Sequence, residues 1–338
     1  MKLMKSIIVC LCFFLSYFSG CVDTNDPFTG SDISNLSVDI TVNSDGSGDF
    51  VSIQDALNAS HENDIIFVFE GIYFENLLID KPVYLIGMDP ENTIIDGNTT
   101  SDVIDIIANH VIIQNLTIQN SGLQGKITEF NAGVSCNSNS NQIVNCILRN
   151  NTVGILVHFQ QYNTIEANQF YDNIYGIYTT ECVYNTIANN SFHNNNKYGV
   201  YLYSTSNLNY VMDNVFFNNT NGLRVKGNDN LVVRNVFQGN TGGLYICCGA
   251  FGNMVYHNSF INNSIYQGKG NFRGNNWSME LPVGGNYWHD YKGEDTGGDG
   301  IGDSLYVVYE RNNSGVLQVI EDKYPLIKPI VISKMLIN

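Results

Sequence analysis

Three carboxylates near the C-terminus stand four residues apart in a glycine-rich segment and have the chemistry of a metal site. They are Asp295, Asp299 and Asp303, in the run Asp-Thr-Gly-Gly-Asp-Gly-Ile-Gly-Asp. Hard carboxylate oxygens on a flexible loop suit Ca²⁺. The spacing is not that of an EF-hand and the distal Glu of such a loop is missing, so a solvated acidic turn is the alternative. We expect a structural calcium site here.

Softer donors occur in an earlier stretch of the chain. A copper site would need Cys, Met and His side chains together, and Cys247, Cys248, Met254 and His257 stand close in sequence. An inward-facing Met, a scattered His and a vicinal Cys pair packed at a corner explain the same residues, and this interpretation is favoured. We therefore favour a calcium site at the acidic loop over a copper site at these residues.

Tyrosines and cations recur at fixed distances after a series of glycines and have the chemistry of a sugar-binding surface. Stacked aromatic rings suit the apolar faces of sugars, and a cation would suit the carboxylate of a uronic acid. The alternative is that Tyr is simply a good residue for an exposed strand. Because the recurrence places these side chains on one face pointing to solvent, we expect a carbohydrate-binding surface made of Tyr178, Tyr201, Tyr203, Arg224, Lys226 and Tyr245.

Carboxylates that could catalyse hydrolysis are sparse in the same region. Hydrolysis of a glycosidic bond uses two carboxyl groups about 5 to 10 Å apart. None of the acids falls at the tyrosine positions; they are Glu166, Asp172, Glu181, Asp213 and Asp229. The sequence offers no convincing catalytic set, and enzymatic activity stays open.

The positions of the candidate residues are set by a repeat of about 22 residues. An Asn opens each unit, at Asn163, Asn185, Asn209, Asn230 and Asn253. A second Asn, a Phe and a third Asn follow at fixed distances, and then a Gly begins a short apolar alternation. A period in this range is typical of a solenoid, and short strands that recur once per unit stack in parallel, about 4.8 Å apart. We predict an all-β, right-handed, single-stranded parallel β-helix of about ten coils.

The recurring Asn and Gly residues have expected backbone roles. Asn tolerates the left-handed conformation and its amide can bond the backbone of a turn, and stacked Asn side chains can also bond one another along the axis. Gly is expected to supply a positive φ at the remaining corner. A solenoid needs capped ends. Residues 53–63 predict a short N-terminal helical cap, and Tyr287, Trp288 and Tyr291 are expected to cover the other end of the core.

The N-terminus has the features of a targeting segment. Lys2 and Lys5 precede an apolar stretch, residues 7–18, which is too short to span a bilayer comfortably. The run Phe-Ser-Gly-Cys that ends at Cys21 resembles a lipoprotein cleavage box, which would make Cys21 the lipid-bearing first residue of the mature chain. An ordinary cleaved signal peptide is the alternative.

The predicted organisation is a signal peptide at 1–20, a polar tether at 21–40, the parallel β-helix at 41–282, and an irregular C-terminal cap at 283–338 that holds the acidic loop. A net charge of −16 would repel the phosphates of a nucleic acid, so such a partner is not expected. The expected partners are a carbohydrate or cell-envelope glycan, and a membrane through the lipid anchor only. We expect an exported protein on the outer face of the cell membrane or in the periplasm.

With the repeat identified, the chain resembles the NosD-like proteins, a parallel β-helix family also called carbohydrate-binding and sugar-hydrolysis domains, in the pectin-lyase-like superfamily. The markers are segments 45–50, 71–76, 285–291 and 299–303 around the Asn/Gly coils. The resemblance covers nearly the whole mature chain and implies the fold, with a surface or periplasmic location and, in some members, a link to copper delivery.

The opening segment also resembles pectin methylesterases. Their diagnostic strings Asp-Phe-Ile-Phe-Gly and Leu-Gly-Arg-Pro-Trp are absent, so esterase activity is disfavoured. The predicted function is glycan binding by a surface-anchored β-helix. The alternatives are a polysaccharide lyase or hydrolase, a periplasmic copper accessory protein, and a purely structural envelope component.

Overall fold

The computed structural model describes residues 37–123, 130–314 and 316–330. The predicted signal peptide, most of the predicted tether, and Cys21 lie outside these residues. Within them, no helix has the length and apolar character needed to cross a membrane.

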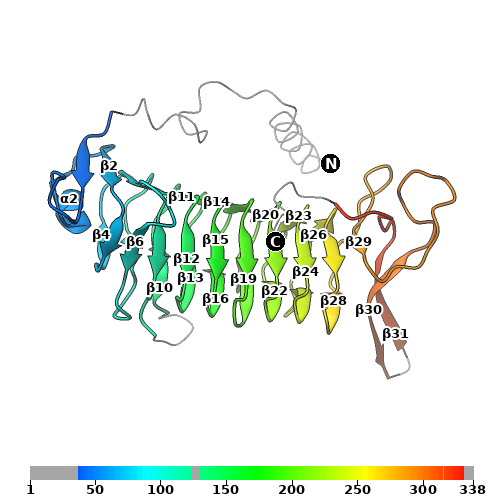
Figure 1. Cartoon of the computed structure of the whole chain (residues 1–338). Coiled ribbons are helices and arrows are strands. Elements are labelled where there is room, and N and C mark those ends of the chain that lie inside the picture. The colour runs from blue at the N-terminus through cyan, green and yellow to red at the C-terminus, as the bar shows by residue number, and fades with distance from the viewer. Residues whose placement is uncertain (1–36, 124–129, 315, 331–338) are drawn as a thin grey trace. The chain divides into compact units, whose positions relative to one another are not determined.

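The described chain winds into a right-handed parallel β-helix of about ten turns, which confirms the predicted fold class (Figure 1). Each full turn contributes one short strand to each of three parallel sheets. Sheet A contains β1 (Ile40–Val42), β2 (Ile65–Val68), β5 (Tyr84–Gly87), β8 (Ile112–Gln114), β11 (Gln142–Val144), β14 (Thr164–Glu166), β17 (Thr186–Ala188), β20 (Tyr210–Met212), β23 (Leu231–Val233) and β26 (Met254–Tyr256).

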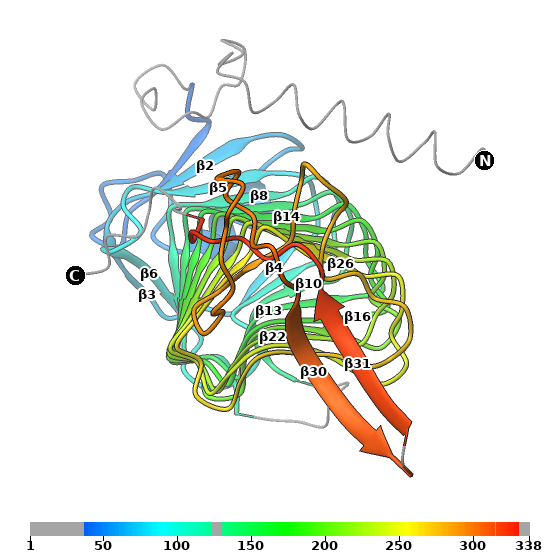
Figure 2. The same cartoon turned by 90° about the vertical axis from the view of Figure 1, so that its right-hand side faces the viewer.

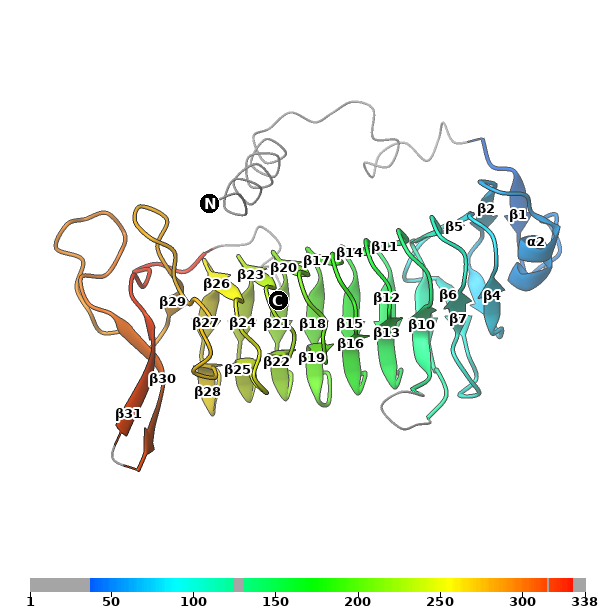
Figure 3. The same ribbon diagram turned by 180° about the vertical axis from the view of Figure 1, so that it is seen from behind.

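The other two sheets close the coil (Figure 3). Sheet B contains β3 (Gly71–Tyr73), β6 (Thr93–Asp96), β9 (Thr117–Gln119), β12 (Ile147–Arg149), β15 (Gln169–Tyr171), β18 (Ser191–His193), β21 (Val215–Phe217), β24 (Val236–Gln238), β27 (Ser259–Ile261) and β29 (Tyr287–Trp288). Sheet C contains β4 (Leu77–Ile79), β7 (Ile104–Ile106), β10 (Ala132–Cys136), β13 (Val153–His158), β16 (Tyr175–Thr180), β19 (Tyr198–Tyr203), β22 (Asn221–Val225), β25 (Gly242–Ile246) and β28 (Tyr266–Lys269).

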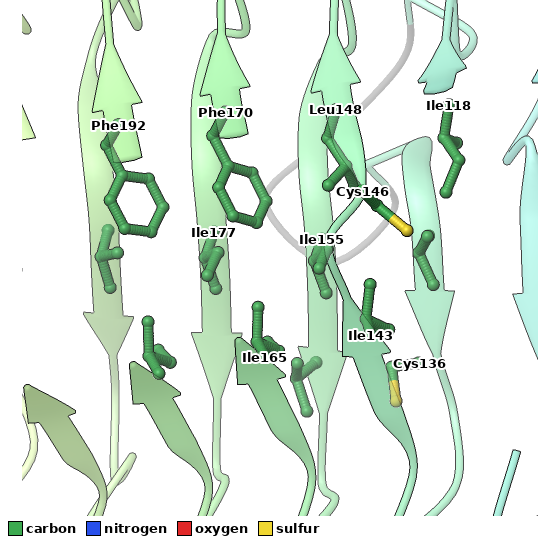
Figure 4. Close-up of a cluster of buried hydrophobic side chains, with 14 of the residues drawn as sticks. Ile118, Cys136, Ile143, Cys146, Leu148, Ile155, Ile165, Phe170, Ile177 and Phe192 are labelled. Atoms are coloured by element: carbon green, nitrogen blue, oxygen red, sulfur yellow. The ribbon is translucent and has the colours of Figure 1, made fainter. Parts of the chain in front are cut away.

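The core is a set of columns in which like residues stack from coil to coil. Phe170, Phe192, Phe216, Phe237 and Phe260 pair in register on sheet B, with ring centroids 4.7–5.0 Å apart. Figure 4 shows the rings of Phe170 and Phe192 pointing into the space between the sheets, opposite aliphatic side chains such as Ile165 and Ile177. All five are fully buried. Because every strand pairs residue for residue with its copy, inward and outward positions stay constant along the helix.

Buried Asn side chains form three ladders, one at each corner between sheets. In the middle of a ladder, the Oδ1 of Asn190 accepts from the backbone N–H of Asn168 at 2.9 Å and from its Nδ2 at 3.1 Å. The first ladder is Asn141, Asn163, Asn185, Asn209, Asn230, Asn253 and Asn275; the second runs from Asn168 through Asn190, Asn214, Asn235, Asn258 and Asn286 to Asp322; the third is Asn151, Asn173, Asn195, Asn219, Asn240 and Asn263, ending on Gln267. The expected bonding between stacked Asn side chains is confirmed.

The backbone roles predicted for Asn and Gly are wrong in detail. The ladder Asn residues do not adopt positive φ; the residue just before each often does, such as Ala167 at 57° before Asn168. That residue turns the chain, and the Asn that follows points its amide inward. The corner glycines also lack positive φ. At Gly199, a Cβ would lie 2.7 Å from Cδ1 of Phe216 and 2.8 Å from the carbonyl oxygen of Gly222. Close packing against the Phe column therefore requires Gly here.

The N-terminal cap is the short helix α2 (Ile53–Ala59), where the helical cap was predicted. Ser52 is its N-cap and accepts from the N–H of Asp55. The carboxylate of Glu75, from the next coil, accepts from the N–H groups of Ile53 and Gln54 at 2.9 Å, which satisfies donors that a helix start leaves free. The apolar side of the helix is buried on the first coils.

The C-terminal cap is more regular than predicted. Trp288 stacks on Phe260 with centroids 4.4 Å apart, and Tyr306 stacks on Trp288 at the same distance. Aromatic rings therefore close the core, but of the three predicted residues only Trp288 lies in the stack; Tyr291 packs edge-on against Tyr306, and Tyr287 is partly exposed. Beyond them, β30 (Tyr306–Asn313) and β31 (Val316–Asp322) form an antiparallel hairpin instead of irregular chain (Figure 2). The hairpin lies outside the repeat, so the repeat pattern could not indicate it.

A ladder Asn should contribute far more stability than an exposed one. Asn190→Ala removes an acceptor from two donors of Asn168 and leaves buried polar groups unpaired, and we expect a loss of roughly 3 kcal/mol in the free energy of unfolding. The exposed Asn196 provides the matched control, because Asn196→Ala removes no ladder bond. Urea unfolding followed by circular dichroism measures both; equal midpoints for the two variants would contradict the role of the ladders.

The carboxyl of Asp322 should give the C-terminal cap a pH dependence. Burial raises its pKa to about 6, although it accepts hydrogen bonds from Asn286, Trp288 and Tyr324. The folded state therefore binds a proton that the unfolded state has released between about pH 4 and 6. The contribution of this group is most favourable below about pH 4 and declines as the pH rises through 6, by about 3 kcal/mol in total.

The variant Asp322→Asn isolates this effect, because it keeps an amide oxygen for the ladder but cannot ionise. We expect its stability relative to the parent protein to improve as the pH rises from 4 to 7. A difference between the two proteins that stays constant over this range, in urea midpoints measured at each pH, would show that the carboxyl does not titrate in the folded state.

Candidate functional site

The outer side of sheet C brings the predicted tyrosines and cations together. The pairing register aligns Tyr178, Tyr201, Arg224, Tyr245 and Lys269 in one column. A neighbouring column holds Tyr175, Tyr198 and Tyr266. The name tyrosine face is used here for these two columns together with Tyr203 and Lys226. All six predicted residues belong to it.

Two of the predicted tyrosines are less accessible than expected. Tyr178 and Tyr201 point away from the main core but are only 1% and 6% exposed. Tyr178 is covered by neighbouring rings, with Tyr201 edge-on at 5.3 Å and Phe130 at 5.6 Å. Burial raises the pKa of both phenols. These rings therefore form a second apolar cluster outside the helix, and the partly exposed Tyr203, Lys226 and Tyr245 form the accessible surface.

Cations lie over the tyrosine rings. The Arg224 guanidinium is 5.1 Å from the ring centroid of Tyr201 and 5.4 Å from that of Tyr245, and its Nη1 donates to the Tyr198 hydroxyl at 2.7 Å. The Nζ of Lys226 is 4.3 Å from the ring centroid of Tyr203. Such contacts fix the direction of each cation by attraction to the ring quadrupole.

Within the described part of the chain, none of these cations has a carboxylate partner. Among residues 37–123, 130–314 and 316–330, the ion pairs are His61–Asp64 and Arg234–Asp213, and neither belongs to the tyrosine face. A part-buried cation without an opposite charge is costly unless other groups compensate it. The tyrosine face is thus locally positive on a chain whose net charge is −16.

A cavity of about 390 Å³ lies at the C-terminal end of the tyrosine face, against the hairpin of β30 and β31. Three cations line it, namely Lys269, Arg273 and Arg311, and none of its lining residues is acidic. Lys269 Nζ lies 5.3 Å from the ring centroids of both Tyr245 and Tyr309. Sequence reasoning missed these residues. Lys269 follows Tyr245 in the same column, so extending the repeat by one coil could have predicted it. Arg311 and Tyr309 lie outside the repeat and could not be predicted in this way.

The donors considered for copper do not gather into one site. Cys247 and Cys248 follow β25 of sheet C, with their Sγ atoms 2.9 Å apart. Met254 starts β26 of sheet A, and His257 lies after that strand with its Nε2 2.6 Å from the carbonyl oxygen of Val283. Among the described residues, no three His, Cys, Asp or Glu side chains form a group fit for a metal. These donors do not fit a copper centre.

The acidic loop uses its carboxylates to hold its own backbone. Asp295 accepts from the N–H groups of Gly298 and Gly300, at 2.6 and 2.9 Å, and Asp303 accepts from that of Thr296 at 2.9 Å. Hydrogen bonding to Thr296 lowers the pKa of Asp303. Asp299 accepts from the N–H of Ile301 at 3.0 Å. The three aspartates thus shape one loop but are not gathered into a ligand group in this structure, so calcium binding there stays a prediction that would need their carboxylates to turn toward one another.

Calcium binding to Asp295, Asp299 and Asp303 should raise the thermal midpoint of the protein, because a ligand that binds only the folded state stabilises it. At a free Ca²⁺ concentration of 100 times Kd, the gain is about 2.7 kcal/mol. Melting curves with Ca²⁺ and with a chelator test this, with Asp295→Asn as the variant. Identical curves under both conditions would rule out a structural calcium ion.

Comparison with known proteins places the fold and the family. The model of the family described as "Periplasmic copper-binding protein (NosD)" matches residues 51–242 and 91–293. Among solved structures, a complex of XylC with xylose has a TM-score of 0.53 at 10% identity, covering 74% of this chain and 71% of that one. ORF18 of Geobacillus virus E2 has a TM-score of 0.51 at 16% identity, covering 78% of this chain and 64% of that one. These likenesses show the fold.

Among curated proteins, a probable pectinesterase/pectinesterase inhibitor 13 of Arabidopsis thaliana is 40% identical over 74 residues, which is 20% of this chain and 12% of that protein. A second one, number 6, is 35% identical over 101 residues, or 25% of this chain and 18% of that protein. The chain therefore spans less than a fifth of the length of these relatives. The periplasmic description of the matching family agrees with the predicted export. Since its model matches well over half of the sequence in an unbroken set of coils, the chain belongs to the NosD family of parallel β-helix proteins.

Proposed function

We propose that this protein is an exported binder of acidic polysaccharide, which lies along the tyrosine face with its carboxylates near Arg224, Lys226 and Lys269. One observation carries the proposal. Arg224 and Lys226, which share one coil at β22, and Lys269 of β28, two coils further on, are held over tyrosine rings and have no carboxylate within ion-pair distance in the described chain. A ligand carboxylate would supply the missing opposite charge.

The geometry favours an extended ligand over a compact one. Outward residues in a column repeat at the spacing of paired strands, about 4.8 Å, so a chain laid along the axis would pass a cation or a tyrosine ring at each of the coils from β22 to β28. The accessible rings of Tyr203 and Tyr245 offer apolar surface to the sugar faces. The buried Tyr178 and Tyr201 keep their neighbours in place and belong to the support of the surface, not to its contact area.

The cavity beside the hairpin gives the face a preferred end. Lys269, Arg273 and Arg311 surround it, and Arg311 also lies 5.2 Å from the ring centroid of Phe272. Three cations around one opening would bind the carboxylate of a terminal or kinked sugar more tightly than the flat part of the tyrosine face would bind it. Binding should weaken with added salt, because exposed charges are screened at about 10 Å in 0.1 M salt.

Substitutions on the tyrosine face should weaken binding of polygalacturonate or alginate. We expect Tyr203→Ala and the double variant Lys226→Ala/Lys269→Ala each to raise Kd about 5- to 30-fold, corresponding to about 1–2 kcal/mol. Tyr171→Ala on the outer side of sheet B and Lys323→Ala near the C-terminus are matched controls that should bind as the parent does. Isothermal titration with each polymer measures this, with neutral dextran as the uncharged comparison.

Unchanged affinity in both face variants, or equal affinity for dextran and polygalacturonate, would overturn the proposal. Circular dichroism of each variant separates lost binding from lost folding. The substitutions are at partly exposed side chains, so the coils beneath them should remain intact.

The proposed attachment is a lipid on Cys21, which would hold the binding domain at a membrane without crossing it. Cys21→Ser should move the exported protein from the membrane fraction to the soluble fraction when cells are lysed and spun. Parent protein that already fractionates as soluble would exclude the anchor, whatever the outcome of the polysaccharide measurements.

A further inference from the structure

Two adjacent cysteines lie in the wall of the cavity described above and have no role in the core. Cys247 and Cys248 both line it, and their Sγ atoms are 2.9 Å apart. Cys247 is 3% exposed, whereas Cys248 is exposed to solvent. One sulfur is therefore open to a reagent, and its partner sits directly behind it.

The other described cysteines are different. Cys136, Cys146 and Cys182 are buried inside the β-helix. Burial raises the pKa of Cys136 and Cys146 to about 12 and that of Cys182 to about 11. Thiols in such surroundings are inert, because the thiolate is the reactive form. Of the five cysteines that the structure describes, only Cys247 and Cys248 combine two thiols in contact with access from outside.

The backbone at the pair forms a turn that brings the sulfurs together. Cys248 has a φ of 61° and Gly249 a φ of 86°, and the N–H of Ala250 donates to the carbonyl oxygen of Cys247 at 3.2 Å. A disulfide bond is about 2.05 Å long, so closure needs a movement of only about 0.9 Å between the two sulfurs.

Positive charge surrounds the pair. Arg224 Nε donates to Cys247 Sγ at 3.4 Å, and Lys269, Arg273 and Arg311 line the same cavity. Nearby cations stabilise a thiolate. Burial still raises the pKa of Cys247, so the open Cys248 is the thiol that meets an oxidant first and Cys247 is the one that resolves.

We propose that Cys247 and Cys248 are a redox-active pair that closes into a vicinal disulfide by exchange with a disulfide-bearing oxidant, RSSR. The Cys248 thiolate attacks one sulfur of RSSR, forming a mixed disulfide and releasing RS⁻. Cys247 then loses its proton to solvent and attacks Cys248 Sγ, which forms the ring and expels the second RS⁻. The protein loses two protons and two electrons, and RSSR gains both and becomes two RSH.

The ring should open and close under mild conditions. Adjacent Cα atoms are about 3.8 Å apart, below the 4.4–6.8 Å usual for disulfides, and strained or exposed disulfides are the ones that are easily reduced. The pair is therefore a modification site responsive to the thiol balance around an exported protein, not a structural crosslink.

Mass spectrometry of the full chain tests the proposal directly. The reduced protein is equilibrated with glutathione at several ratios of oxidised to reduced form, quenched with iodoacetamide, unfolded and digested with trypsin. Cleavage after Arg234 and Lys269 gives a peptide, 235–269, whose cysteines are Cys247 and Cys248. We expect this peptide to lose about 2 Da with no added group when oxidised glutathione is in excess.

Two outcomes would overturn the proposal: a peptide alkylated at both cysteines at every ratio, or one that retains glutathione on one sulfur. In Cys247→Ser the glutathione adduct on Cys248 should accumulate, because the resolving thiol is gone. In Cys248→Ser the remaining buried thiol should react about 10-fold more slowly than Cys248 does. Circular dichroism of both variants confirms folding, and the core cysteines, protected until unfolding, are the internal control.

Discussion

Buried amides that bond to one another along the axis are the constraint on which the rest of the molecule depends. At each corner the chain turns sharply and would leave backbone N–H groups without partners inside the protein, which is costly. The Asn at that corner accepts from the N–H of the corresponding Asn one coil earlier, and its own N–H and Nδ2 donate to the next coil. The backbone N–H groups at the corners therefore find hydrogen-bond partners only when successive coils have the same register.

The shared register aligns the residues on the surface as well as those in the core. Because Phe170 lies beside Phe192 inside sheet B, the outward residues of sheet C must also align, and a chain with few charged residues can still build a surface of defined chemistry. Sheet C has the longest strands of the central coils, such as Tyr175–Thr180 and Tyr198–Tyr203. Its outer side therefore has room for the neighbouring columns that make up the tyrosine face. The cations on this face are held by rings and, among the described residues, have no carboxylate at ion-pair distance, so their charge is not compensated locally.

Most of this arrangement could be predicted from the sequence, because the repeat encodes it. The positions of the corner glycines Gly176, Gly199 and Gly222 indicated which outward residues stack. The second residue after each glycine is Tyr178, Tyr201 or Arg224, and these three lie in one column. The spacing does not indicate the φ angle of an individual residue. For this reason the left-handed conformation was predicted for the ladder Asn, whereas the structure has it at the preceding residue, such as Ala167. The spacing also does not indicate how much of a side chain is exposed to solvent. Tyr178 points outward as predicted but is covered by rings of other coils, an effect of side-chain size that only the packed structure shows.

The cavity shows the limit of repeat-based reasoning more clearly. Lys269 lies in register with Tyr245, but its coil lacks the preceding pattern of Gly and apolar residues. Arg311 belongs to the hairpin, which is not part of the repeat. Its position beside the last coils is known only from the folded structure. The copper donors illustrate the reverse case, since Cys247 and His257 are near in sequence but point from different sides of one coil.

The second ladder has a direction, and its last member explains where the coils stop. Every amide in it donates toward the C-terminus, so the final position needs a group that accepts and has nothing to pass on. Asp322 meets this need with a carboxylate that takes the bonds from Asn286 and Trp288. A duplicated coil inserted among the Asn units would find donors and acceptors on both sides, whereas one appended after the carboxylate would find no amide to continue from. In this ladder a further coil can therefore be accommodated before the carboxylate but not after it.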